Sequence, residues 1–431
     1  MLNRRLIEDY IIEYEEFKPR IISRELKVPL GMDFIISIIG PRRAGKTYYL
    51  FQLRQRSNGL YLNFEDSRLL GISYRELRDI IRIYIEITGK TPRYLYLDEV
   101  QNLKGWEIIV RELHDLKKYR IIITGSSSKL LSREIATQLR GRTLSYILLP
   151  FSFREYLRAK GIHVKDYMSL DEEAKLRNSL REYLEYGGFP EVVLCDEKLK
   201  ILKEYSDLIL FRDFIERHSI RNINLARFLH TYLIQNIARE ITVKSIYNKL
   251  KSMNVRVSKD TIYRYMQNIQ DTVLFFLVKK YSEKVHLRES WPKKVYIADV
   301  GLIKVHGAVK DLGKIMENTV FLELLRKINE NPLLEIYYWK NPVTKREVDF
   351  VVKEGSNIKQ LIQVTYELRY DDREHYSREV KSLLEASRKL KCNDLLIITW
   401  DQEEEIKENS KRIILLPLWK WLLQPNLKLK Q

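Results

Sequence analysis

Residues 34–50 read Phe-Ile-Ile-Ser-Ile-Ile-Gly40-Pro-Arg-Arg-Ala-Gly45-Lys46-Thr47-Tyr-Tyr-Leu. Their centre matches the pattern G-x-x-x-x-G-K-[ST], in which a loop between a strand and a helix binds phosphate groups. The apolar run before Gly40 has the length of a buried strand, and a helical pattern follows Thr47. In such a loop the glycines let backbone N–H groups turn toward the phosphates, and the helix dipole adds to the attraction. The stretch therefore predicts a nucleotide phosphate site.

The loop also supplies side chains expected to act on a nucleoside triphosphate. Lys46 is expected to reach the β- and γ-phosphates, and Thr47 to coordinate Mg²⁺. The residues expected to bind the nucleotide are Gly40, Pro41, Arg42, Arg43, Ala44, Gly45, Lys46, Thr47 and Tyr48. A nucleotide with bound Mg²⁺ is the cofactor that these residue types favour.

A second apolar run, residues 94–97, ends in Asp98-Glu99. Strands commonly end in acids, so the pair alone indicates little. Its position downstream of the phosphate loop indicates a catalytic role. Asp98 is expected to hold Mg²⁺, and Glu99 to accept the proton of the attacking water. Glu99 is thus the candidate catalytic base.

Two further segments offer catalytic side chains. The run Ile-Ile-Ile-Thr124-Gly predicts a strand whose tip lies beside the phosphate loop, so that Thr124 or Ser126 contacts the γ-phosphate or orients the water. The alternative is an ordinary strand–helix cap. In Arg140-Gly-Arg142, Arg142 is slightly favoured as an arginine supplied to the transition state across a subunit boundary, which requires a homo-oligomer. The alternative is a pair of surface arginines.

Alternating patterns predict how the chain is organised. Amphipathic stretches separate five short apolar runs, at residues 34–39, 59–64, 94–97, 121–124 and 145–149. This alternation predicts an α/β domain with a parallel sheet. From residue 151 to about 233 the pattern is helical, with a turn at Gly187-Gly-Phe-Pro190, and residues 301–431 mix strands with helices.

Charge is unevenly spread over the chain. Lys and Arg number 76 against 58 Asp and Glu, a formal net charge of +18. Residues 239–294 hold 13 of the basic but only 5 of the acidic side chains, so DNA is the favoured partner of this segment. Hydrophobic residues make up 45% of the chain, which excludes a mainly disordered protein. Only two cysteines and no apolar run of membrane-spanning length favour a cytoplasmic protein without disulfides or membrane attachment.

Within the basic segment, residues 245–251 and 258–268 predict two helices joined by a turn, and strands follow at 273–280 and 294–297. This is the layout of a helix-turn-helix with a wing, whose second helix would enter the major groove of DNA. The residues of that helix expected to contact DNA are Lys259, Thr261, Tyr263, Arg264 and Gln267. The cations would bind phosphates, and the Thr and Gln side chains would read bases. The alternative is a winged helix that packs against protein or serves as an ATPase lid.

The motifs together resemble those of the AAA-type P-loop ATPases of archaea and bacteria. The segments similar to that family are Gly40-Pro-Arg-Arg-Ala-Gly-Lys-Thr, Leu97-Asp-Glu-Val-Gln-Asn, Thr124-Gly-Ser-Ser-Ser, Gly141-Arg, Pro150-Phe-Ser-Phe-Arg-Glu-Tyr, Tyr186-Gly-Gly-Phe-Pro-Glu-Val and Ala298-Asp-Val-Gly-Leu. The resemblance implies that the nucleotide is ATP. It also implies four domains, namely an AAA-type ATPase domain at 1–155, a helical lid at 156–238, a winged helix at 239–300 and an endonuclease-like domain at 301–431.

The last of these domains resembles restriction endonucleases through Glu317-Asn and the run Glu-Val-Asp349-Phe. Such a core needs an acid on a helix, an Asp on one strand and Glu-x-Lys on the next. Here the third element reads Gln363-Val-Thr365, so one carboxylate and the Lys are missing, and nothing in the sequence places Lys353 as a substitute. The residues Glu317, Asp349, Gln363 and Thr365 are therefore expected to form a degenerate nuclease site without cleavage activity.

The leading hypothesis is a Mg²⁺-dependent ATPase whose nucleotide state controls DNA binding. One alternative is an ATP-dependent nuclease. The other is a nucleotide-dependent switch that binds a protein partner and no nucleic acid.

Overall fold

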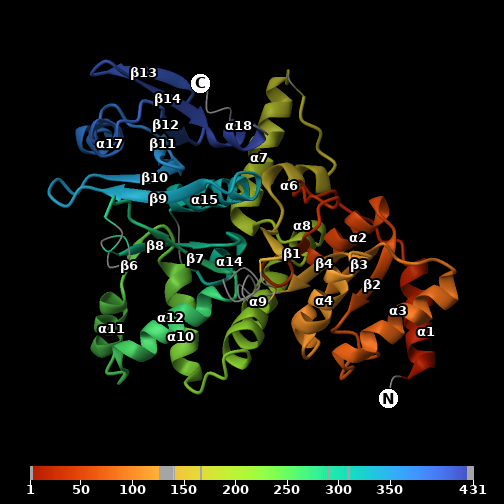
Figure 1. Cartoon of the computed structure of the whole chain (residues 1–431). Coiled ribbons are helices and arrows are strands. Elements are labelled where there is room, and N and C mark those ends of the chain that lie inside the picture. The colour runs from red at the N-terminus through yellow and green to blue at the C-terminus, as the bar shows by residue number, and fades with distance from the viewer. Residues whose placement is uncertain are drawn as a thin grey trace. The chain divides into compact units, whose positions relative to one another are not determined.

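A computed structural model of the chain describes residues 3–125, 139, 141–165, 167–284, 286, 288, 292–307 and 311–424 (Figure 1). These residues form two compact units. The first extends to Leu148 and includes Asp271–Val273, and the second holds Leu149–Gln270 and the residues from Leu274 onward. None of the described helices combines the length and the apolar character needed to cross a bilayer.

The first unit is built on a five-stranded parallel sheet. In sheet order, the strands are β2 (Gly59–Asn63), β3 (Tyr94–Asp98), β4 (Arg120–Gly125), β1 (Ile35–Ile39) and β5 (Thr143–Ile147). The helices are α1 (Arg4–Glu16), α2 (Lys46–Arg56), α3 (Leu77–Thr88) and α4 (Trp106–Asp115). Strands β1 to β4 are almost wholly buried, as expected for parallel strands covered on both faces. The predicted α/β domain with a parallel sheet is confirmed.

Strand order decides which loop ends meet. β4 pairs in parallel with both β1 and β3, so the carboxyl ends of these three strands lie side by side. The loop after β1 leads directly into α2, and glycine is required at two of its positions. A Cβ atom on Gly40 would lie 2.0 Å from the carbonyl oxygen of Leu148, and Gly45 has a φ of +93°. The loop thus turns tightly at the edge where Asp98 and Thr124 end their strands.

The second unit begins with helices. They are α6 (Phe153–Ala159), α7 (Leu170–Tyr186), α8 (Pro190–Leu194), α9 (Lys198–Leu208), a π-helical segment (Ile209–Glu216), α10 (Ile223–Gln235), α11 (Val243–Ser252), α12 (Lys259–Gln270), α14 (Gly301–Val305) and α15 (Leu312–Glu330). Within the predicted helical stretch, α9 continues directly into the π-helical segment Ile209–Glu216. Between α7 and α8, the predicted Gly-Gly-Phe-Pro turn is present.

Two sheets complete this unit. A three-stranded antiparallel sheet has the order β6 (Glu240–Ile241), β8 (Lys293–Ile297) and β7 (Phe275–Lys279). A mixed sheet has the order β13 (Glu404–Glu408), β14 (Lys411–Pro417), β12 (Leu395–Thr399), β11 (Asn357–Val364), β10 (Glu347–Glu354) and β9 (Leu334–Lys340). Helices α16 (Arg373–Tyr376), α17 (Ser382–Leu390) and α18 (Leu418–Leu423) accompany the mixed sheet, with a π-helical turn at Ser377–Lys381. A later α/β sheet domain, as predicted, is therefore present.

Asp299 joins two distant motifs of the second unit. Its buried carboxylate accepts hydrogen bonds from the backbone N–H groups of Gly188, at 2.7 Å, and Gly301, at 2.9 Å. A Cβ atom on Gly187 would lie 1.8 Å from a carboxylate oxygen of Asp299, and one on Gly301 would lie 2.1 Å from the carbonyl oxygen of Tyr186. The Gly-Gly-Phe-Pro turn and the Ala-Asp-Val-Gly segment thus form one close-packed contact that only glycine permits.

Candidate functional site

Lys46 lies at the centre of the phosphate loop and is buried. Its Nζ donates hydrogen bonds to the carbonyl oxygens of Gly40 and Pro41, each at 3.2 Å, and lies 3.6 Å from Oε1 of Glu99. Arg43 has a φ of +68°, so the loop backbone curls around this ammonium group. The ammonium thus lies inside the loop, where a phosphate-binding loop holds its ligand.

Asp98 is completely buried and gathers three hydroxyl groups. Its Oδ2 accepts hydrogen bonds from Thr47, at 2.6 Å, and from Tyr61, at 2.9 Å, and its Oδ1 accepts one from Thr124. Burial, followed by the charge of Glu99, raises the pKa of Asp98. A bound cation would favour the ionised carboxylate. Because Mg²⁺ prefers oxygen ligands, the adjacent oxygens of Thr47 and Asp98 fit the metal of a nucleotide site.

Glu99 adopts a left-handed backbone conformation, with a φ of +49°. Its N–H donates to the hydroxyl oxygen of Thr124 at 3.0 Å, and its carboxylate accepts a hydrogen bond from the Gln101 side chain. The Thr124 hydroxyl therefore donates to Asp98 and accepts from Glu99. The structure brings Lys46 together with both acids and Thr124.

Other loop residues point elsewhere. Arg42 forms an ion pair with Glu65 at 3.2 Å, and half of the Tyr48 surface is exposed. Arg142 precedes β5, and its carbonyl oxygen accepts a hydrogen bond from the N–H of Ile35, where β1 begins. Arg142 therefore lies at the sheet end opposite the phosphate loop, and its guanidinium binds Asp115 at 2.8 and 3.3 Å. Any catalytic role for it needs a second copy of the chain.

Sequence reasoning missed several residues that shape this site. Tyr61 and Gln101 contact the two acids, as described above. The buried Arg24 donates to the carbonyl oxygen of Ala44 at 2.9 Å, and its backbone N–H donates to the Gln52 side chain at 2.7 Å. Its contacts span 20 and 28 positions, so no local pattern could have revealed them. Ser126 and Arg140, named as alternatives for catalysis, lie outside the described residues.

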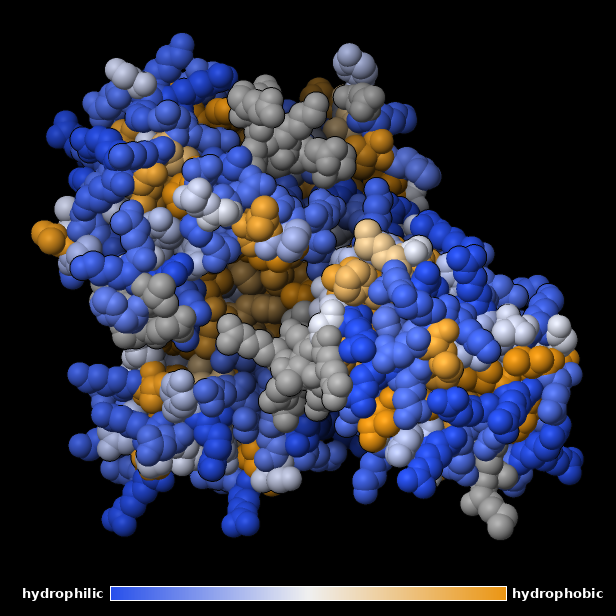
Figure 2. Space-filling view, in the orientation of Figure 1, coloured by the Kyte–Doolittle hydropathy of each residue, from blue (hydrophilic) through white to orange (hydrophobic). Residues whose placement is uncertain are grey.

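The predicted DNA-contacting residues lie on α12, the second of two helices that residues 253–258 connect. Lys259, Tyr263, Arg264 and Gln267 are exposed, and α11 and α12 bury their apolar faces toward the protein. Thr261 is half-buried, and its hydroxyl lies 2.9 Å from that of Ser258, so its hydrogen-bonding capacity is partly used. Figure 2 shows a mostly hydrophilic surface over these helices.

The basic side chains of this pair share a further property. Among the residues that the structure describes, no carboxylate forms an ion pair with Lys244, Lys249, Lys251, Arg256, Lys259 or Arg264, all of which are exposed. This set is called the basic face below. Three of these cations lie on α11, two on α12 and Arg256 in the loop between the helices. Exposed cations without carboxylate partners favour contact with a polyanion.

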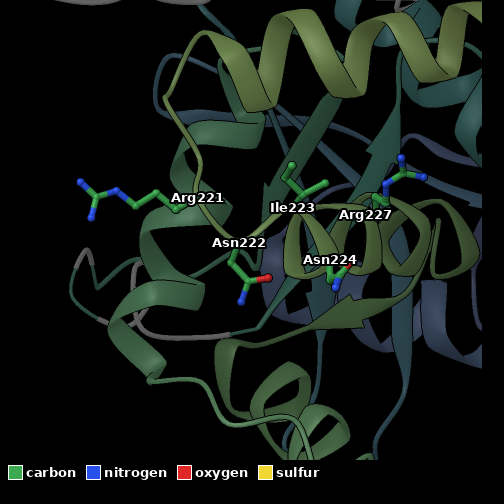
Figure 3. Close-up of a pocket in the computed structure, with 5 residues that line it drawn as sticks. All are labelled: Arg221, Asn222, Ile223, Asn224 and Arg227. Atoms are coloured by element: carbon green, nitrogen blue, oxygen red, sulfur yellow. The ribbon is translucent and has the colours of Figure 1, made fainter.

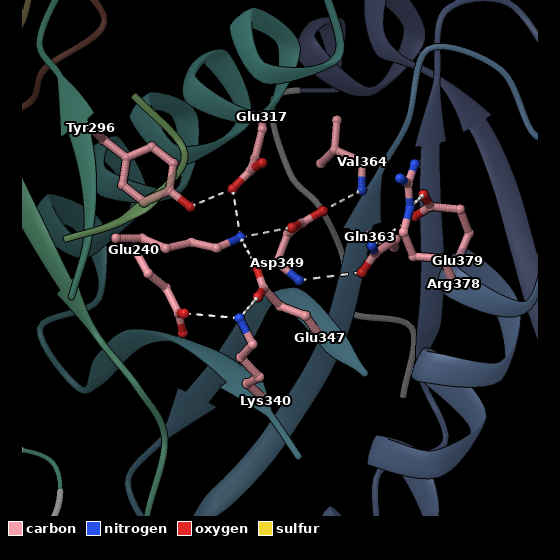
Figure 4. A network of polar contacts seen from close by, with 11 residues as sticks. Glu240, Tyr296, Glu317, Lys340, Glu347, Asp349, Gln363, Val364, Arg378 and Glu379 are labelled. Carbon is pink, nitrogen blue, oxygen red and sulfur yellow. Dashed lines mark hydrogen bonds and ion pairs between the residues drawn. The ribbon is translucent and has the colours of Figure 1, made fainter. Parts of the chain in front are cut away.

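Two of the predicted nuclease residues, Glu317 and Asp349, contact a lysine that no sequence motif marks. Nζ of Lys294, on β8, lies 3.0 Å from Glu317, 2.7 Å from Glu347 and 2.9 Å from Asp349. Figure 4 labels these three acidic residues. Burial lowers the pKa of Lys294, but Asp349 and Glu317 raise it more, so it stays well above its usual value. Burial, followed by the charge of Asp349, raises the pKa of Glu317 to about 8.

The other two residues of the predicted nuclease site have structural partners. Gln363 accepts a hydrogen bond from the N–H of Asp349 at 3.3 Å and donates to Glu379 at 2.7 Å. The Thr365 hydroxyl donates to the carbonyl oxygen of Glu367 at 3.2 Å. A metal ion does not fit this arrangement, because an ammonium group already lies among the carboxylates. Within the described ranges, no group of three His, Cys, Asp or Glu residues is arranged to hold a metal.

Two pockets accompany these groups in the second unit. The larger, of about 1130 Å³, opens over the Lys294 cluster and is lined by side chains of both charges. The smaller, of about 710 Å³, lies at the start of α10 (Figure 3). Its Arg221 and Arg227 point in different directions, and the Asn222 side chain accepts a hydrogen bond from the N–H of Leu225. The smaller pocket thus has no convergent set of polar groups.

Comparison with known proteins identifies parts of the chain. Residues 33–157 match the family model of the AAA domain. Residues 177–312 and 312–421 match two models described as domains of unknown function, DUF8612 and DUF4143. Over 441 residues the chain is 40% identical to the uncharacterized protein MJ1544 of Methanocaldococcus jannaschii, covering 98% of this chain and 96% of that protein.

A second relative is an uncharacterized protein of Haemophilus influenzae, 31% identical over 413 residues, with 91% of this chain and 95% of that protein covered. A solved structure of the Aeropyrum pernix ORC1 protein in complex with DNA matches at 11% identity and a TM-score of 0.26, covering 71% of this chain and 92% of that one. From the near full-length matches, the chain belongs to one family with the Methanocaldococcus jannaschii and Haemophilus influenzae proteins, and it carries an AAA domain.

Proposed function

We propose that this chain is a Mg²⁺-dependent ATPase whose nucleotide state controls its binding to DNA. The observation that carries the ATPase part is the meeting of Lys46, Asp98, Glu99 and Thr124 at one edge of the sheet. The AAA domain match over the same residues supports it. AAA-type sheets with a phosphate loop and two strand-end acids suit ATP hydrolysis, because little covalent chemistry is needed beyond positioning and charge stabilisation.

Each side chain has a role in this proposal. Bound ATP with Mg²⁺ would supply the transferable phosphate and the charge that activates it. With the nucleotide bound, Lys46 would exchange its loop carbonyls for phosphate oxygens, and Thr47 and Asp98 would hold the cation. Glu99 accepts a proton from the attacking water at its carboxylate. Thr124 fixes the Glu99 backbone through the N–H contact, so the base stays beside the loop.

The DNA part of the proposal rests on the basic face. Six exposed cations without carboxylate partners would bind backbone phosphates, and binding would therefore weaken steeply with salt. Gln267 would be the main reader of bases, since the Thr261 hydroxyl is already in contact with Ser258. In the three-stranded sheet, β6 precedes α11, and β7 and β8 follow α12, and this element order supports a winged-helix interpretation.

The test of this function is steady-state ATP hydrolysis with duplex DNA, with single-stranded DNA and without DNA, each at two salt concentrations. We expect DNA to stimulate hydrolysis and the stimulation to fade at high salt. Hydrolysis that is equal under all conditions would contradict the coupling and favour a protein partner. The absence of any hydrolysis with Mg²⁺ would contradict the ATPase itself.

Charge reversal on the basic face tests the DNA interface directly. We expect Lys259→Glu with Arg264→Glu to weaken binding to every duplex and to make the log–log salt slope shallower by about 2, because two phosphate contacts are lost. Fluorescence anisotropy of labelled duplex over a salt series measures both effects. Lys407→Glu, an exposed residue on β13, is the matched control and should leave both unchanged. Equal binding by the double variant would exclude α12 from the interface.

A further inference from the structure

The hydroxyl group of Tyr61 contacts the carboxylate that the proposed function assigns to the metal. Tyr61 lies on β2, two positions before Asn63, which is the residue opposite Asp98 on β3. Alternate residues of a strand share a face, so Tyr61 and Asp98 lie on the same face of the sheet. The Tyr61 hydroxyl donates to Oδ2 of Asp98 at 2.9 Å. Because Tyr61 is 2% exposed, this hydrogen bond replaces the one that an exposed phenol would make to water.

Three hydroxyl groups from three elements orient the Asp98 carboxylate. Thr47 on α2 and Tyr61 on β2 donate to Oδ2, and Thr124 on β4 donates to Oδ1. An ionised carboxylate accepts at about four lone-pair positions, so these donors fill most of them and fix the plane of the group. Oδ2 is the oxygen in contact with Thr47, which is proposed to bind the cation. Tyr61 therefore fixes the oxygen on the side of the proposed cation site.

Tyr61 differs from the other two donors in its chemistry. In the proposed function, Thr47 binds the cation and Thr124 holds the backbone N–H of Glu99. The phenol of Tyr61 carries no charge, so it orients the carboxylate without neutralising it. A lysine or arginine at this position would compete with a cation for the same oxygen. Hydrogen bonds to a metal-binding carboxylate commonly orient it and tune its affinity for the metal.

Aromatic neighbours from two helices hold the ring of Tyr61. Its centroid lies 4.7 Å from that of Phe51 on α2 and 5.0 Å from that of Tyr14 on α1. α1 is itself tied to α2, because the guanidinium of Arg54 donates to the carbonyl oxygen of Tyr14 at 2.6 Å. The packed ring therefore keeps its hydroxyl directed at Asp98.

We propose that Tyr61 is a positioning residue, which holds the Asp98 carboxylate in the orientation that binds the Mg²⁺ of the nucleotide, and that Tyr14 of α1 keeps the phenol ring in place. The inference rests on the proposed ATPase and adds to it, because α1, which supplies no residue of the phosphate loop, becomes part of the support of the metal site. The hydroxyl then matters for the metal and not for the nucleotide alone. That difference is measurable as the factor by which Mg²⁺ tightens nucleotide binding.

The test measures the dissociation constant of a non-hydrolysable ATP analogue by isothermal titration calorimetry, once with excess Mg²⁺ and once in EDTA. The ratio of the two constants is the gain from Mg²⁺. Tyr61→Phe keeps the ring and removes the hydroxyl. We expect it to lower this gain by about tenfold and to leave the constant in EDTA near that of the wild type.

Tyr96→Phe is the matched control. Its ring is also buried and lies on the neighbouring strand, but its hydroxyl donates to the carbonyl oxygen of Ser57 at 2.8 Å. This variant loses the same chemical group and should keep the full gain from Mg²⁺. Tyr14→Leu keeps an apolar side chain on α1 and should lower the gain less than Tyr61→Phe does. Combined with Tyr61→Phe it should add no further loss, since both changes act through one hydroxyl.

The outcomes separate the role of Tyr61 from the proposed function. Equal gains from Mg²⁺ in the wild type and Tyr61→Phe would overturn the role of Tyr61 and leave the ATPase intact. A wild type that binds the analogue no more tightly with Mg²⁺ than in EDTA would contradict the proposed function and the role of Tyr61 with it. A gain lowered equally by Tyr61→Phe and Tyr96→Phe would indicate a general loss of packing and also overturn the proposal. Should Tyr61→Phe not fold, a lowered gain in Tyr14→Leu supports the proposal and an unchanged gain contradicts it.

Discussion

Glu99→Gln is expected to lower steady-state ATP hydrolysis by about 100-fold or more while ATP still binds. A general base contributes typically 10²–10⁴-fold to a rate, and Gln cannot accept the proton of the attacking water. The backbone contact of this residue with Thr124 is unaffected by the change, so the loop should keep its shape. Phosphate release measures hydrolysis, and filter binding of labelled ATP measures retention.

A matched control shows whether the effect is specific to Glu99 or follows from the loss of any carboxylate in this unit. Glu112 is exposed on α4 and pairs with Arg78, so Glu112→Gln should leave the rate at the wild-type level. Hydrolysis by Glu99→Gln at an undiminished rate would contradict the assignment of Glu99. Loss of both hydrolysis and ATP binding would instead indicate that Glu99 supports the loop, through its 3.6 Å contact with Lys46.

Asp299→Ala has the largest expected effect on stability, about 4 kcal/mol. The change would leave the buried N–H groups of Gly188 and Gly301 without acceptors, and each such group costs about 1–3 kcal/mol. Asp299→Asn keeps one oxygen acceptor, so its free energy of unfolding should lie between those of the wild type and Asp299→Ala. Urea unfolding followed by circular dichroism at pH 4 measures the loss. Asp401→Ala, which removes an exposed carboxylate 3.6 Å from Arg177, is the control and should change little.

The same carboxyl group gives a pH dependence of defined sign. Burial raises the pKa of Asp299 from 3.8 to about 7, so the folded chain binds this proton more tightly than the unfolded chain. Its contribution to the free energy of unfolding is therefore full below pH 4 and is lost as the pH rises through 7. Between pH 4 and pH 7 the free energy of unfolding of the wild type should therefore fall by this contribution, and that of Asp299→Asn should not. Parallel pH profiles for both proteins would contradict the raised pKa.

The phosphate site could be predicted because its signals are local. One continuous run holds the strand, the loop and the first turn of α2, and the two acids end a neighbouring apolar strand. Parallel strands place their carboxyl ends at one edge, so the meeting of Asp98 with Thr47 follows from the pattern. Tyr61 could not be found this way, because its ring is indistinguishable from other aromatic core residues until the sheet order is known.

The second unit shows where sequence reasoning fails. Lys294 and Tyr296 alternate on a strand, but their partners lie 21 to 55 positions further along the chain. Strand β13 leaves no strand pattern in the sequence, because Glu-Glu-Ile-Lys-Glu is strongly charged. The hairpin between β13 and β14 uses Asn409 and Ser410, both with positive φ, in place of the more recognisable Asn-Gly. Long-range packing and exposed edge strands leave little trace in local patterns.

The contact made by Asp299 has a consequence for the motions of the folded chain. Gly188 and Gly301 belong to segments more than a hundred positions apart, yet the same carboxylate holds both amides. Neither amide can exchange its hydrogen with solvent until its hydrogen bond to Asp299 breaks. Local unfolding of one segment therefore destabilises the other. The turn before α8 and the start of α14 therefore behave as one cooperative unit in local unfolding, with linked hydrogen-exchange rates.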